Sequence, residues 1–206
     1  MRDLRGLKPT SKRNLSFSEN NPLSQFFITA AGDTPTLFDP NDPPTIVTTQ
    51  GSVEDWTIEN RSLENHEFHI HKLHFLVLGQ NNFKPNGSQP DLSIHGQMLD
   101  TIQIPFWDGN PNHPFPSVVV RMDFRGPDPG DFVYHCHIAE HEDDGMMAII
   151  RVMPSSTSAA VERLRLYLAS WTRAGSTSSG KAAAWCVRGR VKLSGADESI
   201  GNRAVL

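Results

Sequence analysis

The sequence predicts an all-β protein folded as an antiparallel Greek-key β-sandwich. Short segments rich in β-branched and aromatic residues recur as far as Pro154. Clusters of Gly, Pro, Asn and Asp separate these segments, and no strong helical period interrupts them. Each such strand has an apolar face to bury, so several of them are expected to pack as two facing sheets.

The first half of the chain contains three of the expected strands. The earliest is Ser24–Ala30, and the residues before it have no assignment. Phe38–Pro44 is expected to be a loop, because its prolines cannot donate backbone hydrogen bonds to a sheet. Thr45–Gln50 and Val53–Asn60 then flank a Gly-Ser turn, and the alternation in Val53–Asn60 indicates a half-buried strand.

The second half contains a histidine-rich strand that begins at His66 and runs to Gly79. A polar surface excursion over Gln80–Ser93 follows it. The remaining segments with the composition of strands close the sandwich; they are Leu99–Pro105, Ser117–Phe124, Asp131–His137 and Met147–Met153. Because strands lie on both sides of residues 138–146, we expect that loop to be held rigidly.

This loop region carries side chains that bind metals. Cys136, His141 and Met146 are spaced five residues apart. With a second imidazole, a thiolate, an imidazole and a thioether form the ligand set of a blue-copper site. Zinc is the competing metal because it also accepts Cys and His, but a methionine ligand and a lone cysteine favour copper.

The neighbours of Cys136 face the other way. Successive side chains of a strand point to opposite faces, so His135 and His137 share one face and Cys136 takes the other. One strand end therefore offers ligands to two separate metal sites.

The histidines of the histidine-rich strand are divided between two faces in the same manner. His69 and His71 share one face, and His66 has the opposite parity. His66 can thus complete the site of Cys136, while His69 and His71 can join the two histidines beside Cys136. A single H-x-H pair is more often a surface feature than a metal site, but two pairs with matching divisions indicate metal binding.

These motifs resemble those of a known family. His66–His71 resembles the H-P-x-H-x-H segment, and His135–Met146 resembles the H-C-H-x3-H-x4-M segment, of the last cupredoxin (plastocyanin-like) domain of multicopper oxidases, a family that includes laccases. The likeness covers about residues 15–154, and the strand Leu99–Pro105 also resembles a family segment. The chain departs from the family at Glu67, where proline is usual, and at Lys72-Leu73, but neither is a ligand position.

The resemblance implies a role for each proposed ligand. Type 1 copper would be bound by His66, Cys136, His141 and Met146. His69 would match a type 2 ligand, and type 3 ligands would be His71, His135 and His137. The family mechanism implies that a reducing substrate gives single electrons at His141, and that these pass through Cys136 to a three-copper cluster where dioxygen becomes water.

The three-copper cluster cannot close within this chain. In relatives, half of its histidines come from two H-x-H pairs in the first domain. The chain has nine histidines, and those left over, His74, His95 and His113, form no such pair. We expect His95 and His113 to be ordinary surface residues. His74 is expected either to pack in the core or to support a ligand indirectly. The missing ligands would have to come from an N-terminal multicopper oxidase domain or from another subunit.

Three functions are compatible with this pattern. The sequence favours the C-terminal copper domain of a multicopper oxidase, which would be an oxidase only with its partner domain. The alternative is a stand-alone type 1 copper protein that transfers electrons without catalysis. A copper storage or resistance protein is the third. Such a protein would be expected to have more methionine-rich stretches, and this chain has six methionines.

Charge divides the chain into unlike parts. From Ser155 onward there are eight Lys and Arg against three Asp and Glu, a balance of +5, whereas the residues before it have eleven against twenty, a balance of −9. We expect a polar leader over 1–14, the copper domain over 15–154 and a basic, weakly ordered tail over 155–206. This tail is either a basic interaction segment or a non-native extension of the reading frame. Within this tail, Val161–Ala169 could form a helix and Cys186 would be a free thiol.

Composition also limits the partners. The acidic part has no basic patch for nucleic acid, and no apolar run is long enough to span a membrane. Met1–Ser16 lacks the apolar core of a secretory signal. The family resemblance nevertheless implies a periplasmic or extracellular location.

Overall fold

The computed structural model describes residues 3–84, 87–126, 128–156, 161, 163–167 and 169. The chain divides into two compact units, Met1–Leu164 and Arg165–Leu206. The described residues of the expected helix over 161–169 are helical. Most of the predicted tail, including Cys186, lies outside the described residues, and no described helix has the length and apolar character needed to cross a membrane.

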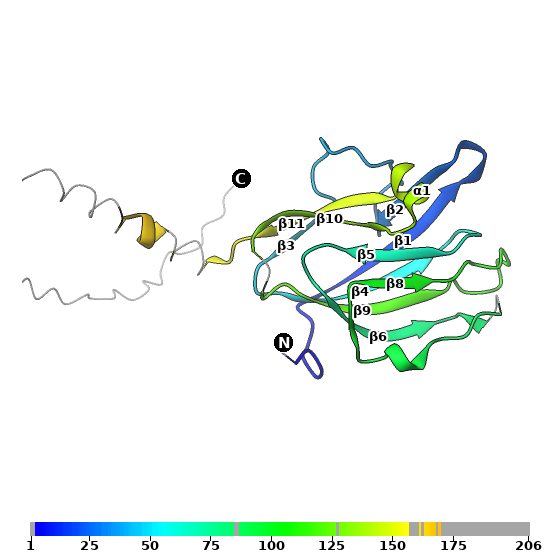
Figure 1. Ribbon diagram of the computed structural model, residues 1–206, viewed down its shortest axis with the longest axis horizontal. Helices are drawn as coiled ribbons and strands as arrows, with labels where there is room; N and C mark the ends of the chain where they lie inside the picture. Colours follow the sequence, from blue (N-terminus) through cyan, green and yellow to red (C-terminus); the bar gives the residue numbers. More distant parts are fainter. Residues whose placement is uncertain are drawn as a thin grey trace, which may run out of the picture. The chain divides into compact units, whose positions relative to one another are not determined.

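The first unit is a sandwich of two mixed β-sheets (Figure 1). The six-stranded sheet has the order β2-β1-β4-β9-β6-β7, with bounds Gln25–Ala30, Ser11–Asn20, Val53–Asn60, Ser117–Asp123, Phe75–Asn81 and Met98–Leu99. The five-stranded sheet has the order β3-β11-β10-β5-β8, with bounds Ile46–Thr49, Met147–Met153, Gly130–Cys136, His66–Ile70 and Thr101–Ile104. Short helices occur at η1 (Asn21–Leu23), η3 (Leu92–Ile94) and α1 (Ala139–Asp143). The predicted all-β sandwich is therefore confirmed.

Two strand pairs differ from the expected antiparallel arrangement. β1 runs parallel to β4, and β3 runs parallel to β11. The reason is topological, because the chain leaves the first sheet after β2, places β3 in the second sheet and returns as β4. A connection that crosses between sheets can bring strands together in the same direction, which a tight hairpin cannot do.

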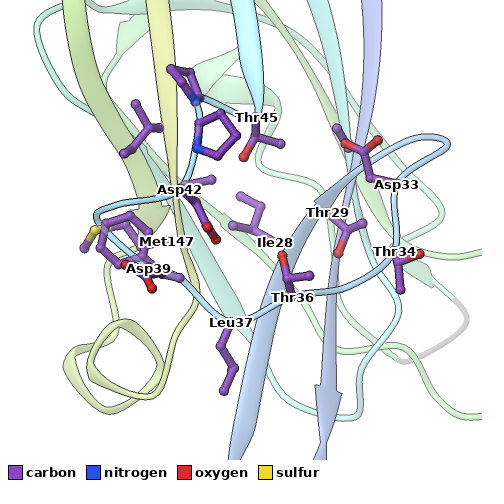
Figure 2. Close-up of a pocket in the computed structure, with 16 residues that line it drawn as sticks. Ile28, Thr29, Asp33, Thr34, Thr36, Leu37, Asp39, Asp42, Thr45 and Met147 are labelled. Carbon is purple, nitrogen blue, oxygen red and sulfur yellow. The ribbon is translucent and has the colours of Figure 1, made fainter.

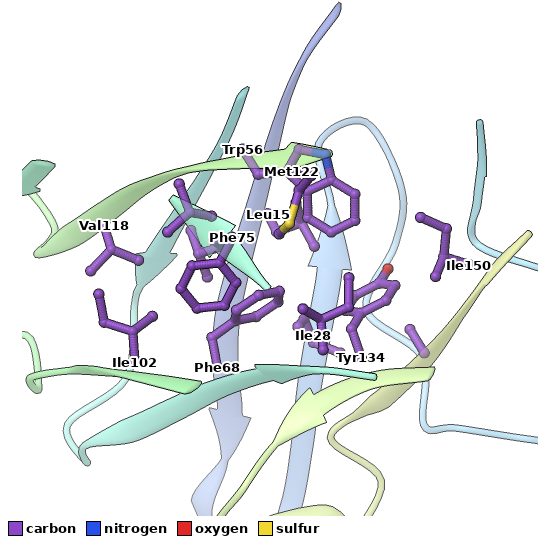
Figure 3. Close-up of a cluster of buried hydrophobic side chains, with 14 of the residues drawn as sticks. Leu15, Ile28, Trp56, Phe68, Phe75, Ile102, Val118, Met122, Tyr134 and Ile150 are labelled. Carbon is purple, nitrogen blue, oxygen red and sulfur yellow. The ribbon is translucent and has the colours of Figure 1, made fainter. Parts of the chain in front are cut away.

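The core fills the space between the two sheets, where large side chains meet (Figure 3). Trp56 of β4 is fully buried, and its ring lies 6.3 Å from that of Phe68 and 5.7 Å from that of Tyr134. Burying each side chain of this size contributes roughly 1.5–3 kcal/mol. Phe68 and Tyr134 lie on the strands that carry the histidine motifs, so this core fixes the strands of the predicted metal sites.

The structure contains a strand, β1, that precedes the earliest strand predicted from the sequence. β1 pairs with β2 from Leu15 opposite Ala30 and with β4 from Ser11 opposite Glu54. Strand pairing therefore extends into the segment predicted to be a polar leader. The local pattern of β1 is mostly polar, and its ladders with β2 and β4 make it a strand.

The histidine-rich segment is not one strand but two. β5 ends at Ile70 and β6 begins at Phe75 in the other sheet, with Lys72 at φ 65° between them. This left-handed turn breaks the parity on which the position of His74 was predicted. The side chain of His74 is 56% exposed, and its Nε2 lies 3.8 Å from an Asp100 carboxylate oxygen. The expected packing role of His74 is therefore wrong. An indirect role beside the ligands stays a prediction, because the carbonyl of Asp100 lies 3.0 Å from the His69 Nδ1.

Candidate metal centre

The predicted ligands are positioned by the pairing of β5 with β10. His135 lies opposite His69, and Cys136 lies opposite Phe68. On β5, His66, Phe68 and Ile70 are buried, whereas the residues between them are less so. The alternation expected from the sequence thus directs His66 and Cys136 to the inner side and His69 and His135 to the other.

On the inner side, one thiol and two imidazoles converge in what we term the closed site, which comprises His66, Cys136 and His141. The Cys136 Sγ lies 3.7 Å from the Nδ1 of His66 and 3.6 Å from the Nδ1 of His141. The two Nδ1 atoms are 3.0 Å apart. All three residues are buried, and their donor atoms lie within 4.8 Å of one another. A single ion could contact all three donors.

The loop around α1 brings Met146 back to Cys136. The backbone N–H of Cys136 donates to the carbonyl of Met146 at 3.0 Å, and the N–H of Met146 donates to the carbonyl of His141 at 2.9 Å. Met146 is fully buried. The predicted spacing of five residues therefore forms a compact turn that places the methionine beside the closed site.

Aromatic rings exclude water from the closed site. The ring of Phe26 stacks on His141 at a centroid distance of 4.2 Å, and the ring of Phe17 lies 5.0 Å from His66. Both phenylalanines are on the six-stranded sheet, so the site forms only when the two sheets pack together. A metal there would be held in an apolar, low-dielectric surrounding.

The electrostatics of the closed site fit a bound cation. Burial lowers the pKa of His66 to about 3, and the nearby His141 adds to the decrease. Burial raises the pKa of the Cys136 thiol, although the backbone amides of Glu67 and Ile138 donate to the sulfur. A neutral imidazole keeps a free lone pair, and a thiophilic ion such as copper would stabilise the thiolate. The donor set therefore fits copper.

The other cluster, which we term the open cluster, consists of His69, His71, His135 and His137. Ring nitrogens of His69, His71 and His135 lie within 4.8 Å of one another, and the Nε2 atoms of His71 and His135 are 3.2 Å apart. The ring of His137 lies 5.0 Å from that of His69. His71 and His137 are exposed, so this cluster opens to the surface.

Two histidines of the open cluster are oriented by partners. The Nδ1 of His69 lies 2.8 Å from the Thr101 hydroxyl and 3.0 Å from the Asp100 carbonyl. The Nδ1 of His135 lies 2.9 Å from the Cys136 carbonyl and 3.1 Å from a Glu142 carboxylate oxygen. Because these acceptors occupy Nδ1, the Nε2 atoms remain available to a ligand.

Protonation is also disfavoured at two histidines of the open cluster. Burial lowers the pKa of both His69 and His71, and the neighbouring His135 lowers both further. Histidines that stay neutral near neutral pH are suited to binding a metal.

Every predicted ligand lies in or beside one of these two groups. The sequence did not identify the contacts that Asn60, Ser62, Glu64 and Glu142 make, directly or through one another, with the imidazoles of predicted ligands. Ser62 stands only four residues before His66, but its contact depends on the path of the loop between β4 and β5. No spacing rule distinguishes it from an ordinary surface serine.

The cavity shown in Figure 2 is a separate feature. Its volume is about 440 Å³, and its lining includes Asp33, Asp39, Asp42 and Met147. None of the predicted ligands lines it. It adjoins the loop of the closed site, since the Phe38 N–H donates to the Gly145 carbonyl at 3.2 Å. The donors are thus buried behind this surface rather than displayed in the cavity.

The fold and the two donor groups define a metal-binding, cupredoxin-like β-sandwich. The multicopper oxidase family model matches residues 7–156, and the chain belongs to that family. Membership implies copper as the cofactor.

Individual relatives agree. A laccase from Haloferax volcanii is 32% identical over 97 residues, which is 47% of this chain and 15% of that protein. A multicopper oxidase from Campylobacter jejuni, described as a metallo-oxidase, has a TM-score of 0.54 at 25% identity, with 73% of this chain and 31% of that chain covered. A multicopper oxidase from Pediococcus acidilactici has a TM-score of 0.51 at 25% identity, with 76% and 30% covered. The chain thus spans about a third or less of the length of these relatives.

Proposed function

We propose that this chain is the copper-binding C-terminal domain of a multicopper oxidase. Type 1 copper would be held by His66, Cys136, His141 and Met146. The open cluster would contribute His69 to a type 2 site and His71, His135 and His137 to type 3 sites. The division into a copper domain that ends near residue 154 and a separate tail from residue 155 belongs to this proposal.

The observation that carries this proposal is the way one strand end joins the two donor groups. Cys136 belongs to the closed site, and the residues on either side of it belong to the open cluster. Only covalent bonds along the backbone separate the two groups. Such adjacency provides a short path between an electron acceptor site and a site of dioxygen reduction.

The residues of the chain would hold and shield the metal. Bound copper would supply one-electron redox chemistry at the closed site and the reduction of dioxygen to water at the open cluster. Phe26 and Phe17 keep water from the closed site, and the amides of Glu67 and Ile138 donate to the Cys136 sulfur. The Nε2 of His141, 3.2 Å from a Glu64 carboxylate oxygen, points to the side on which a small reducing substrate would deliver electrons.

The open cluster indicates the kind of partner that would be required. His71 and His137 are exposed, and the chain matches about a third or less of its relatives. We infer that an N-terminal multicopper oxidase domain, or another subunit with two H-x-H pairs, covers this face and completes the cluster. The family relationship favours a periplasmic or extracellular location for the assembled enzyme.

The second candidate is a stand-alone electron-transfer protein with type 1 copper alone. The completeness of the closed site within one chain favours it, since all the closed-site donors come from this chain. The two functions differ in whether the open cluster is ever completed.

The test is to reconstitute the full chain with copper and to measure its visible spectrum and its copper content. We expect an intense blue thiolate band with about one tightly bound copper per chain. Cys136→Ser should abolish the band, whereas His71→Ala should leave it in place. A chain that binds copper without the band would contradict the assignment of the closed site.

Oxygen consumption separates the two candidate functions. If the chain is the C-terminal domain of an oxidase, dioxygen uptake should be absent alone and should appear with a covering domain that carries two H-x-H pairs. Fast electron exchange with a soluble redox dye, together with no dioxygen uptake in any assembly, would favour the stand-alone function.

A further inference from the structure

Strand β4 ends at a fully buried asparagine, Asn60, and the hydrogen bonds of its side chain determine how that side chain is oriented. One side-chain atom of Asn60 lies 2.7 Å from the Glu64 carbonyl, 3.0 Å from the Pro105 carbonyl and 3.2 Å from the Ile104 carbonyl. Carbonyls only accept hydrogen bonds, so this atom is Nδ2. The other atom, Oδ1, accepts from the backbone N–H of Ser62 at 2.9 Å.

This orientation decides what the Ser62 hydroxyl does. Its Oγ lies 2.7 Å from the Asn60 Oδ1 and 2.6 Å from the Nε2 of His66. A hydroxyl has one proton, and Asn60 Oδ1 can only accept, so Ser62 donates to Asn60. Ser62 must then accept from His66, which places the imidazole proton on Nε2. The Glu64 carbonyl, 3.3 Å from the same hydroxyl, is also an acceptor and leaves this assignment unchanged.

The same loop contacts the second imidazole of the closed site. A carboxylate oxygen of Glu64 lies 3.2 Å from the Nε2 of His141. A carboxylate accepts, so the proton of this ring is also on Nε2. When both rings are neutral, both Nδ1 atoms are therefore unprotonated, and they face each other at 3.0 Å beside the Cys136 sulfur. Two lone pairs this close repel each other unless a cation lies between them.

We propose that this loop is a tautomer relay, in which Asn60 orients Ser62, Ser62 fixes the proton of His66 on Nε2, and Glu64 does the same for His141. The relay prepares both Nδ1 atoms for the metal before it binds. This inference rests on the proposed copper site. Asn60, Ser62 and Glu64 are positioning residues, because they act on the donors and do not contact the metal position themselves.

The relay can be distinguished from hydrogen bonds that only stabilise the loop, because the relay also sets the tautomer of His66. If the hydrogen bonds only held the loop, Ser62→Ala would lower stability and leave the His66 proton where it is. If they form a relay, Ser62→Ala releases the ring to exchange its proton between Nε2 and Nδ1. Metal binding then has to exclude the wrong tautomer, and loss of such a partner typically weakens metal affinity about 10–100-fold.

The experiment compares the metal-free full chain and the copper-loaded full chain for the wild type and three variants. Long-range ¹⁵N–¹H correlations of the imidazole rings report the tautomer of His66 in the metal-free chain at neutral pH. Competition with a copper chelator and the electron paramagnetic resonance spectrum report the loaded site. Ser62→Ala removes the hydroxyl, Ser62→Thr keeps it, and Ser16→Ala removes a similarly buried serine hydroxyl on β1 that takes no part in the relay.

We expect His66 to be the Nε2–H tautomer in the wild type, in Ser62→Thr and in Ser16→Ala. Ser62→Ala should show mixed tautomers, a copper affinity about 10–100-fold weaker and an altered spectrum. A wild-type His66 with its proton on Nδ1 would overturn the relay. So would unchanged His66 signals in Ser62→Ala, or equal losses in Ser62→Ala and Ser62→Thr.

The proposed function and the relay can fail separately. A wild-type chain that shows no blue band contradicts the copper assignment, while the spectra of the metal-free chain still decide the relay. A wild-type chain with the band, together with a Ser62→Ala variant whose tautomer and affinity are both unchanged, retains the function and refutes the relay.

Discussion

The closed site and the open cluster arise from the same strands but differ in what the chain supplies. The closed site has all its donors buried between the two sheets, and aromatic rings from the opposite sheet cover it. The open cluster lies on the outer side of the same strands, where His71 and His137 remain exposed. Strand alternation places His66 and Cys136 on one face and His69 and His135 on the other. Burial decides which of the two groups is sealed from solvent.

The largest expected difference between the closed site and the open cluster is in how the stability of the chain depends on pH. The unfolded chain protonates His66 near pH 6.5, but the folded metal-free chain does so only near pH 3. The unfolded state therefore holds more protons between these values, and stability falls as the pH decreases through that window. The expected slope is about 1.4 kcal/mol per pH unit for this residue at the centre of the window.

Urea unfolding of the metal-free chain at a series of pH values measures this slope. His66→Gln should flatten the dependence strongly. His71→Gln should flatten it less, because His71 is exposed in the open cluster. Equal flattening by both substitutions would show that burial does not distinguish the two groups.

Truncation of Phe26, whose ring covers His141, should change the spectrum of the closed site. Phe26→Ala removes the ring that stacks on His141, and loss of a buried phenylalanine costs about 3–5 kcal/mol. Phe83→Ala is the matched control, because Phe83 is comparably buried and has no ring contact with either group among the described residues. Both variants should lose stability, but only Phe26→Ala should weaken and shift the blue band. A shift of similar size in Phe83→Ala would contradict a local role for the cover.

Gly145→Ala tests the loop that brings the backbone of Met146 to Cys136. Gly145 has φ +107°, and a Cβ there would lie 2.6 Å from the Leu37 Cδ2. Gly145→Ala should cost about 1–3 kcal/mol, because the left-handed backbone is strained for alanine whatever the side chain of Leu37 does. Leu37→Ala in the same chain should restore only the steric part.

The control for this prediction is Gly96→Ala. Gly96 has φ +77° and no contact of an added Cβ under 3.6 Å, so alanine there would be strained in its backbone but far in sequence from the loop of residues 138–146. Thermal unfolding should show a loss in both variants, and only Gly145→Ala should alter the spectrum of the closed site. An unaltered spectrum would mean that the position of Met146 tolerates a displaced loop.

The smallest effect is expected at a histidine that belongs to neither group. His74 is exposed, and among the described residues its side chain has only a long polar contact, with Asp100, so His74→Ala should change stability by less than about 0.5 kcal/mol. Copper content and the blue band should remain those of the wild type. A clear loss of copper would place His74 among the ligands and would contradict the division into two groups.

The parts of the site that could be predicted depend on local rules. The opposite parity of Cys136 and its neighbours follows from strand geometry. The five-residue spacings of Cys136, His141 and Met146 predict that a short loop, here the one around α1, brings these residues together. The position of His74 could not be predicted in this way. The left-handed turn at Lys72 transfers the chain to the other sheet, and a periodic pattern cannot show such a turn.

The first strand was missed for a different reason. β1 is held by a parallel ladder with β4, and the Arg13 guanidinium contacts the Glu54 carboxylate at 2.6 Å. These partners stand about forty residues apart in the chain. Their contact leaves no local pattern in the sequence, because long-range pairing is specified by both strands together.

The sequence by itself determined the fold class, the family motifs and the division of the ligands between two faces, since these depend on residue type and on a period of two. Only the tertiary structure decided which face is sealed and which is open, and how the imidazoles are held. Phe26 of the six-stranded sheet stacks on His141. Ser62 contacts His66 from the loop after β4, where the Asn60 side chain donates to three carbonyls. Burial and hydrogen-bond direction are properties of the packed chain, so no reading of neighbours in sequence could supply them.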